Sequence, residues 1–305
     1  MKNIAFFLRN IDPDKLPFSS RELYYYSYQQ NLLAMKRAGA NAAFVTNNAT
    51  YLGKGRFREA FTIDHVGDVS ELIPLGEFQA DVVYDKGGFA GQDTTMVTDW
   101  RLEPLMNDKT EIYRRFPEFQ PKSVICETPE EVTEAMKAMP GDMVVVKGAE
   151  GTGGKRVYIG HKGEVNVPAD ETYPLIVQEF IDMSEGIPGL VKGPHDLRIL
   201  MTGSAIAGAT VRQPAEGSYH SNVSRGGSEM VLDVDAIPEG VAEMAAAIDA
   251  KLPDHPRYYA IDFARGKHGW RLIELNRKPG LFQESDGVAA RHIMDRLAAY
   301  LVSLA

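Results

Sequence analysis

The hydrophobic pattern of the first hundred residues predicts strands that alternate with a helix. Short apolar runs at residues 4–8, 42–46 and 81–84 are typical of buried strands. Residues 21–38 are expected to form a helix that Gly39 ends as its C-cap. This strand–helix–strand order favours an α/β domain with a parallel sheet and a right-handed crossover.

The middle of the chain is predicted to begin with helices and to continue as an apolar strand. We expect a helix at residues 109–116. Thr128 is the predicted N-cap of a second helix, with Pro129 at its first position and Glu131 completing a capping box. A proline–glycine pair ends that helix, and residues 142–148 follow as a strand that carries one lysine.

The last third of the chain has the pattern of an antiparallel sheet with two helices, at residues 239–251 and 288–304. Residues 257–265 and 270–276 each alternate apolar and polar positions. The link between them is short and contains glycine, which predicts a hairpin.

Three oxygen-bearing side chains are expected to meet on this hairpin. Glu274 and Asn276 are two residues apart, so they share one face of their strand, and Asp262 lies on the partner strand. Two carboxylates and an amide oxygen form the kind of hard ligand set that suits magnesium bridging nucleotide phosphates. The alternative is a solvated hairpin face.

A glycine-rich loop follows the lysine-bearing strand. Its backbone N–H groups can approach phosphate oxygens closely, and Lys147 adds a positive charge. The loop does not fit the Walker A pattern, because Ala149 replaces the first glycine and Arg156 follows Lys155. An ordinary glycine hairpin with surface lysines is the alternative.

Charge and cysteine content narrow the possible functions. The 305 residues include 33 basic and 42 acidic side chains, and the net charge of −9 argues against general nucleic-acid binding. The single cysteine, Cys126, lies in an apolar run and is expected to be a buried structural thiol, which suits a reducing, cytoplasmic location. No apolar run is long enough to predict a membrane span.

The order and spacing of these motifs resemble the ATP-grasp superfamily. The resemblance extends from about residue 106 to the C-terminus and is closest to the branch that holds glutathione synthetase and the ribosomal-protein glutamate ligases. It rests, beyond the glycine-rich loop, on three signatures in register: Asp196-Leu197-Arg198, Asn222-x-x-Arg225-Gly226-Gly227 and Glu274-x-Asn276-x-x-Pro279-Gly280.

The resemblance implies an ATP-grasp fold, α+β in its C-terminal part, behind an N-terminal parallel-sheet domain. We expect a pre-ATP-grasp domain at residues 1–106, a small lobe with the glycine-rich loop at 107–175, and a C-terminal lobe with the metal and substrate site at 176–305. ATP is expected to lie between the second and third parts.

The resemblance also implies roles for individual residues. Lys109 and Lys147 correspond to the two ATP lysines, and Asp262, Glu274 and Asn276 to the magnesium ligands. The other residues expected to bind nucleotide are those of the flexible phosphate loop (Gly151, Thr152, Gly153, Gly154, Lys155), those of the adenine-binding hinge (Gln178, Glu179, Phe180, Ile181), and Glu185 or Asp182 at the ribose. The groups expected to act on the substrate are Arg198, Arg225 and Arg212, with Asn222 binding the reacting oxygens or holding the arginine loop.

The activity implied is that of an ATP-dependent carboxylate–amine ligase. A carboxylate is phosphorylated, an amine captures the acyl phosphate, and ADP and phosphate leave. We expect magnesium as the cofactor, with two ions, and manganese as a possible replacement. The expected substrates are amino acids or peptides, including a peptide or protein carboxylate, and a homodimer is compatible with the resemblance.

Two alternatives remain at this stage. The same fold can phosphorylate a small molecule and stop there, as a kinase, or bind nucleotide without turnover in a regulatory role. Arg277 and Lys278 also depart from the family pattern after the metal-binding asparagine. They are expected either to bind a second carboxylate or to hold Glu284 and Asp286.

Overall fold

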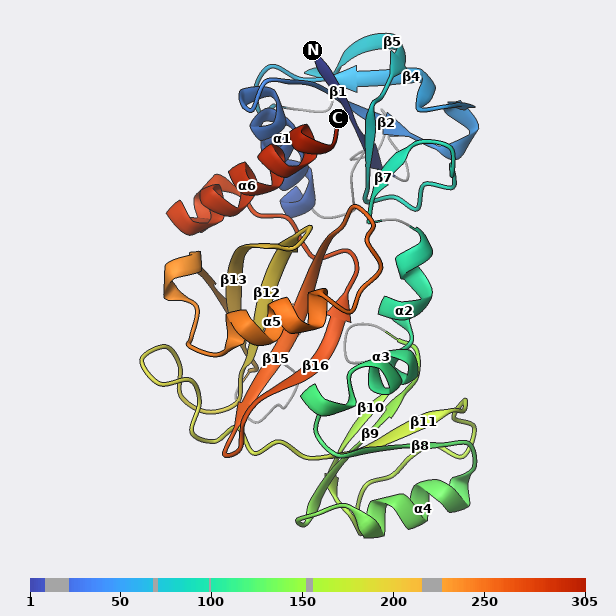
Figure 1. The fold of residues 1–305 in the computed structure, drawn as a ribbon, viewed down its shortest axis with the longest axis vertical. Coiled ribbons are helices and arrows are strands. Elements are labelled where there is room, and N and C mark those ends of the chain that lie inside the picture. Colours follow the sequence, from blue (N-terminus) through green and yellow to red (C-terminus); the bar gives the residue numbers. More distant parts are fainter. Residues whose placement is uncertain (9–21, 68–70, 99, 152–155, 216–226) are drawn as a thin grey trace.

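The computed structural model describes residues 1–8, 22–67, 71–98, 100–151, 156–215 and 227–305. Within these residues the strands form three sheets, which succeed one another along the long axis of the molecule (Figure 1). None of the helices in the described ranges has a stretch long and apolar enough to cross a lipid bilayer.

The N-terminal sheet is parallel at its centre, as predicted, and antiparallel at one side. β1, β2, β6 and β7 pair in parallel, whereas β3, β4 and β5 extend the sheet as antiparallel strands that the sequence pattern did not reveal. The strand bounds are β1 Lys2–Leu8, β2 Ala40–Thr46, β3 Tyr51–Gly53, β4 Arg56–Thr62, β5 Ile73–Gln79, β6 Val82–Asp85 and β7 Thr95–Val97. β5 escaped prediction because six of its seven residues are exposed and give no apolar alternation.

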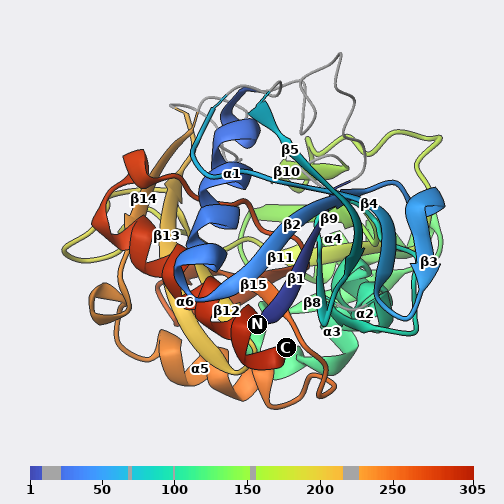
Figure 2. The same cartoon turned by 90° about the horizontal axis from the view of Figure 1, so that it is seen from above.

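β1 is apolar without alternation because both of its faces are covered. Ile4 and Phe6 pack with α1 (Glu22–Arg37) and α6 (Val288–Leu304), while Phe7 packs with aromatic side chains of the opposite face. Figure 2 shows α1 beside α6 and the two chain ends close together, consistent with the hydrogen bond from Lys2 Nζ to the carbonyl of Val302, 2.7 Å.

The second sheet is small, antiparallel and ordered β10-β9-β11-β8. Its strands are β8 Ser123–Cys126, β9 Met143–Gly148, β10 Val157–His161 and β11 Leu175–Glu179. The predicted border between residues 175 and 176 therefore falls inside β11, which pairs with both β8 and β9 and belongs to this lobe. Cys126 is fully buried in its core, as expected.

Helix α4 (Pro129–Ala138) covers one face of this sheet and begins at the predicted N-cap. The Thr128 hydroxyl accepts a hydrogen bond from the N–H of Glu131, 3.2 Å. The predicted capping box is wrong in one partner, because the Glu131 carboxylate accepts from the N–H of Glu127, 2.6 Å, and not from that of Thr128.

The third sheet is antiparallel, as predicted, in the order β14-β13-β12-β15-β16. Its strands are β12 Asp196–Thr202, β13 Ala205–Gln213, β14 Ser228–Leu232, β15 Tyr258–Gly266 and β16 Gly269–Asn276. One face packs against α5 (Val241–Asp249), α2 (Glu103–Asn107) and α3 (Lys109–Arg115). The end of the other face packs against α6 and the N-terminal sheet, so its remaining part is free to form a site.

Candidate functional site

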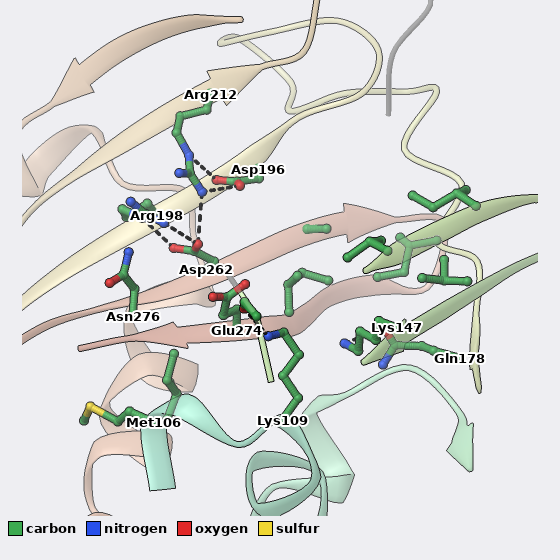
Figure 3. Close-up of a pocket in the computed structure, with 18 of the residues that line it drawn as sticks. Met106, Lys109, Lys147, Gln178, Asp196, Arg198, Arg212, Asp262, Glu274 and Asn276 are labelled. Atoms are coloured by element: carbon green, nitrogen blue, oxygen red, sulfur yellow. Dashed lines mark hydrogen bonds and ion pairs between the residues drawn. The ribbon is translucent and has the colours of Figure 1, made fainter. Parts of the chain in front are cut away.

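A cavity of about 790 Å³ lies between the small sheet and the C-terminal sheet. Strands β9, β10 and β11 contribute to one wall, and β12, β13, β15 and β16 to the other, with residues at the α2–α3 junction between them (Figure 3). Most of the described residues that the sequence assigned to nucleotide, metal or substrate line this one space.

Lys147 faces the cavity because β9 alternates between two environments. Val144 and Val146 pack under α4, while Val145 and Lys147 line the cavity. Lys147 is 6% exposed, and its ammonium donates to Oε1 of Gln178, 3.1 Å. Burial, and then the charge of Lys109, lower the pKa of Lys147 to about 8, although Glu274 opposes this. An anion bound beside Lys147 would stabilise its charged form.

Lys109 lies at the first position of α3, as predicted, where Asp108 is the N-cap and accepts from the N–H of Thr110, 2.8 Å. Its ammonium donates to the carbonyl of Gly151, 2.8 Å, at the start of the glycine-rich loop. Figure 3 shows the side chain extending from α3 toward Glu274, so the two predicted ATP lysines and one predicted metal ligand border the same space.

The predicted hinge lines the cavity with all four of its residues. The side-chain amide of Gln178 is already used, because it also donates to Ser123 Oγ, 2.7 Å. The N–H of Glu179 donates to the carbonyl of Lys122, 2.8 Å. The backbone N–H of Glu179 is therefore not free, and only its carbonyl oxygen could bind an adenine.

The structure does not bring the predicted ribose ligand into the cavity. The Glu185 side chain is 64% exposed and lies 4.0 Å from Arg265. Asp182, the alternative, pairs with Lys267 at 3.1 Å. Neither residue lines the cavity as described, whereas the intervening Met183 does.

The hairpin places Asp262 opposite Glu274, and Ala260 opposite Asn276, in the β15–β16 register. A bulge follows Asp262 on this ladder and leaves Ile273 without a counterpart. Before the bulge, Trp270 and Leu272 point into the core. The bulge shifts the alternation of β16 by one residue, so that Leu275 is the next core residue. Glu274 and Asn276 therefore line the cavity. The predicted convergence of the three side chains is therefore present in the strand pairing.

Asp262 is held by two arginines from neighbouring strands. Arg198 lies directly opposite it on β12 and donates to both carboxylate oxygens, from Nε at 2.7 Å and from Nη2 at 2.6 Å. Arg212 on β13 donates to Asp262 at 3.0 Å and also binds Asp196 with two nitrogens. Figure 3 shows this network as a continuous row across the sheet.

The charges in this row affect the two aspartates in opposite directions. Burial and the neighbouring Asp262 charge raise the pKa of Asp196. Burial would also raise the pKa of Asp262, but Arg198 and then Arg212 outweigh it and lower that pKa. Asp262 is therefore the anion that both arginines stabilise.

Glu274 has a different environment. Its carboxylate makes no hydrogen bond or ion pair with the described residues, and it lines the cavity. Burial raises its pKa, and the Lys109 charge opposes this. The described residues contain no group of three or more His, Cys, Asp or Glu side chains able to hold a metal ion, so a metal site here depends on the amide of Asn276 as well.

Arg277 and Lys278 have partners that the sequence did not indicate. Arg277 pairs with Glu103 of α2 at 2.8 Å, and Lys278 pairs with Asp85 at the end of β6 at 2.6 Å. The expectation that they hold Glu284 and Asp286 is wrong, because the carboxylates they bind come from earlier segments of the chain. The backbone N–H of Lys278 also donates to Oδ1 of Asn276, 3.1 Å.

Some predicted site residues cannot be placed. Those outside the described ranges are Thr152, Gly153, Gly154, Lys155, Asn222 and Arg225. Conversely, the role of Asp196 in holding Arg212 was missed, although it opens the Asp196-Leu197-Arg198 motif. Its position two residues before Arg198 on one strand was the available signal.

Comparison with known proteins agrees with this architecture. Among curated relatives, the probable alpha-L-glutamate ligase of Psychromonas ingrahamii is 30% identical over 166 residues, which cover 53% of this chain and 51% of the relative. The probable alpha-L-glutamate ligase of Chromohalobacter salexigens is 27% identical over 186 residues, covering 59% and 57%. The match thus spans about half the length of these relatives.

Solved structures resemble the chain over its whole length. A RiPP-associated ATP-grasp ligase from Chryseobacterium gregarium has a TM-score of 0.62 at 14% identity, covering 100% of this chain and 98% of that one. D-alanyl-alanine synthetase A from Vibrio cholerae has a TM-score of 0.58 at 15% identity, covering 99% and 98%. At such identities these likenesses show the ATP-grasp fold. Since the family model described as the RimK-like ATP-grasp domain matches residues 113–300, more than half of the sequence, the chain belongs to the RimK-like ATP-grasp family.

Proposed function

We propose that this chain is an ATP-dependent carboxylate–amine ligase that forms an amide or peptide bond. The observation that carries the proposal is the composition of one cavity. Lys147 borders it on the side of the small sheet, Glu274, Asp262 and Arg198 on the side of the C-terminal sheet, and Lys109 lies between them. Such a site can hold a triphosphate and an anionic acceptor together while offsetting their repulsion.

The nucleotide is proposed to lie between the two sheets. Its base would contact the hinge, where Val145 and Ile181 supply apolar surface and the hinge backbone supplies polar groups. Its phosphates would meet Lys147, Lys109 and the loop that begins at Gly151. Lys147 would then exchange its neutral partner, Gln178, for an anion.

Magnesium fits the donor set of the C-terminal sheet. Glu274 offers a carboxylate without other partners among the described residues, and Asn276 offers an amide oxygen beside it. Asp262, the third predicted ligand, is shared with Arg198 and Arg212. When bound, magnesium offsets the negative charge of the phosphates and stabilises charge that develops during transfer. The use of two ions, and of manganese as a replacement, stays a prediction.

The reaction would proceed in two steps. A carboxylate oxygen attacks the γ-phosphorus, the bond to the bridging oxygen breaks, and ADP leaves with the negative charge. An amine nitrogen then attacks the acyl carbon, the carbon–oxygen bond to phosphate breaks, and the amine proton passes to phosphate or solvent. Arg198 and Arg212, held in place by Asp262 and Asp196, would orient the acyl phosphate with the guanidinium N–H groups that these aspartates do not use. Arg225 and Asn222 are proposed for the same step from the sequence alone.

Amino acids or peptides are the proposed substrates, including a carboxylate on a peptide or protein. The curated relatives are named alpha-L-glutamate ligases, and the solved neighbours include a D-alanyl-alanine synthetase and a peptide-binding RiPP ligase. We further infer a cytoplasmic location, because the single cysteine, Cys126, is a free and buried thiol, which fits a reducing compartment. A homodimer stays a prediction.

Hydroxylamine trapping tests the proposal. The protein is incubated with ATP, magnesium, hydroxylamine and a pool of amino acids, short peptides and metabolites, and the products are read by mass spectrometry. A hydroxamate that forms only with ATP identifies both the acyl phosphate and the carboxylate. A stable phosphorylated metabolite without hydroxamate would instead indicate a kinase, and nucleotide binding without either product would indicate a regulatory protein.

A further inference from the structure

The N-terminal sheet contacts the site through two consecutive charged residues at the end of β6. Asp85 pairs with Lys278 at 2.6 Å, and Lys86 donates from Nζ to the carbonyl of Pro279 at 2.5 Å. Both partners lie in the segment that follows Asn276, and Lys278 itself lines the cavity. The carboxyl end of a parallel strand therefore meets the end of the cavity away from the hinge, at a position where α/β sheets commonly bind ligands.

Asp85 pairs with Lys278 and, in the described structure, makes no hydrogen bond with Lys86. Its side chain is 2% exposed, and one oxygen accepts from the N–H groups of Gly87, Gly88 and Phe89 at 2.7–3.0 Å. The other oxygen accepts from Lys278. Asp85 is thus fixed in place by its own loop and by one cation.

Lys86 is left with a neutral acceptor. Among the described residues, the carbonyl of Pro279 is its one hydrogen-bond partner at its ammonium group. Burial, and then the charge of Lys278, lower the pKa of Lys86 to about 7; Asp85 opposes this and Arg198 adds to it. Lys86 as a whole is half-buried, and the next lysine beside it, Lys278, lines the cavity.

Two buried tyrosine hydroxyls have no hydrogen-bond partner among the described residues, but neither tyrosine lines the cavity. Tyr84 immediately precedes Asp85, and its ring lies 6.2 Å from that of Tyr258. The unused donors of the Lys86 ammonium favour an acceptor-rich, anionic ligand beside it.

We propose that Lys86 and Lys278 bind a carboxylate of the amino-acid or peptide substrate that is not the one phosphorylated. The carboxylate that is phosphorylated must lie beside Glu274 and Asp262. Lys278 and Lys86 lie further along the chain segment that follows Asn276, since Lys86 contacts Pro279. The bound group is therefore a second carboxylate, such as the α-carboxylate of an amino acid. The inference rests on the proposed ligase function.

Steady-state kinetics with the carboxylate found by hydroxamate trapping, and with its amine partner, provide the first test. In Lys86→Met, the KM of one of these two substrates should rise at least about tenfold, because a charge-assisted contact is lost. The KM of ATP and the magnesium dependence should stay unchanged. Lys86→Arg should restore part of the loss, since it keeps the charge.

Lys36→Met is a matched control. Lys36 also donates to a backbone carbonyl, that of Ile63 at 2.7 Å, and it pairs with Asp64 at 2.8 Å, far from the segment that follows Asn276. It should leave every KM unchanged. If Lys86→Met altered the KM of ATP and magnesium to the same extent as that of the substrate, Lys86 would only hold the Asn276 segment in place. Unchanged KM values for both substrates in an active, folded variant would also overturn the proposal.

A second test needs no turnover. The protein is treated at pH 7 with N-hydroxysuccinimidyl acetate, with glutarate or neutral glutaramide present, and acetylation of Lys86 is followed by mass spectrometry. Glutarate should slow the acetylation of Lys86 at least about threefold, because it occupies the anion site, and glutaramide should leave the rate unchanged. The exposed Lys137 should react equally in both, and Lys278→Met should weaken the protection. Equal Lys86 rates with glutarate and glutaramide would reject the subsite, whereas protection in a protein without ligase activity would reject the proposed function alone.

Discussion

Asp262 and Glu274 lie directly opposite each other across the β15–β16 pair, but only Asp262 has arginines at hydrogen-bond distance in the described structure. The pKa of Asp262 is therefore lowered despite burial, whereas that of Glu274 is raised by burial. One carboxylate organises the cations of the C-terminal sheet, and its neighbour remains available to a ligand. This division of roles leads to distinct expectations for the two residues.

Glu274→Gln should impair catalysis without impairing folding. We expect turnover to fall by about 100-fold at limiting magnesium, because a ligand charge is removed next to the phosphates. The melting temperature should hardly change, since Glu274 makes no hydrogen bond or ion pair with the described residues. Glu185→Gln, which changes a carboxylate outside the cavity, is the control and should be fully active. Normal turnover of Glu274→Gln at limiting magnesium would exclude Glu274 from the site.

Arg198→Met should destabilise the fold by about 3 kcal/mol, because it leaves the buried Asp262 carboxylate with Arg212 as its one arginine partner among the described residues. Asp262→Asn removes the charge itself, so the double variant should lose less than the sum of the two single variants. Urea unfolding of the four proteins measures this coupling. Additive losses would show that the pair contributes no coupling energy.

Lys147 should make ATP binding depend on pH. Its pKa in the free protein is lowered to about 8, so the ammonium loses its proton as the pH rises through that value. The neutral amine attracts phosphates less, and ATP affinity should therefore fall above pH 8. Calorimetry at pH 8.5 in two buffers of different ionisation enthalpy should detect proton uptake on binding. Lys147→Met should bind ATP weakly and without that uptake; persistence of the uptake in the variant would assign it to another group.

A buried ion pair outside the cavity serves as a structural reference. Asp249 at the end of α5 accepts from Arg257 at 2.7 and 2.9 Å and from the Tyr259 hydroxyl at 2.7 Å, and both charged side chains are 5% exposed. Asp249→Ala should cost about 3–5 kcal/mol of unfolding free energy, since it leaves the Arg257 charge without a carboxylate. The KM of ATP, measured below the melting temperature, should be unchanged. A selective rise in that KM would connect α5 to the nucleotide site.

Local signals in the sequence were sufficient for much of the fold. The hairpin around Gly266 and Gly269, the N-cap at Thr128 and the helix at residues 288–304 follow from turn chemistry, capping and apolar periodicity, which act over a few residues. The lysine of β9 could be assigned in the same way, because its strand alternates between core and cavity.

Other features depended on contacts between distant segments. A strict alternation from Trp270 and Leu272 would have turned Glu274 into the core, and only the bulge in the pairing with β15 turns it into the cavity. The exposed β5 gave no apolar pattern, since the adjacent strand decides its conformation.

The sequence by itself determined the order of the main strands and helices, though not β3, β4 and β5, together with the family motifs and the kinds of side chain available for chemistry, because these depend on neighbours a few positions away. Only the tertiary structure decided that β11 joins the small sheet, that Arg198 binds Asp262, and that Lys278 binds Asp85. Arg198 and Asp262 are 64 positions apart in the sequence, and Lys278 and Asp85 are 193 positions apart. Packing between distant segments therefore selects these pairs, and no local pattern encodes them.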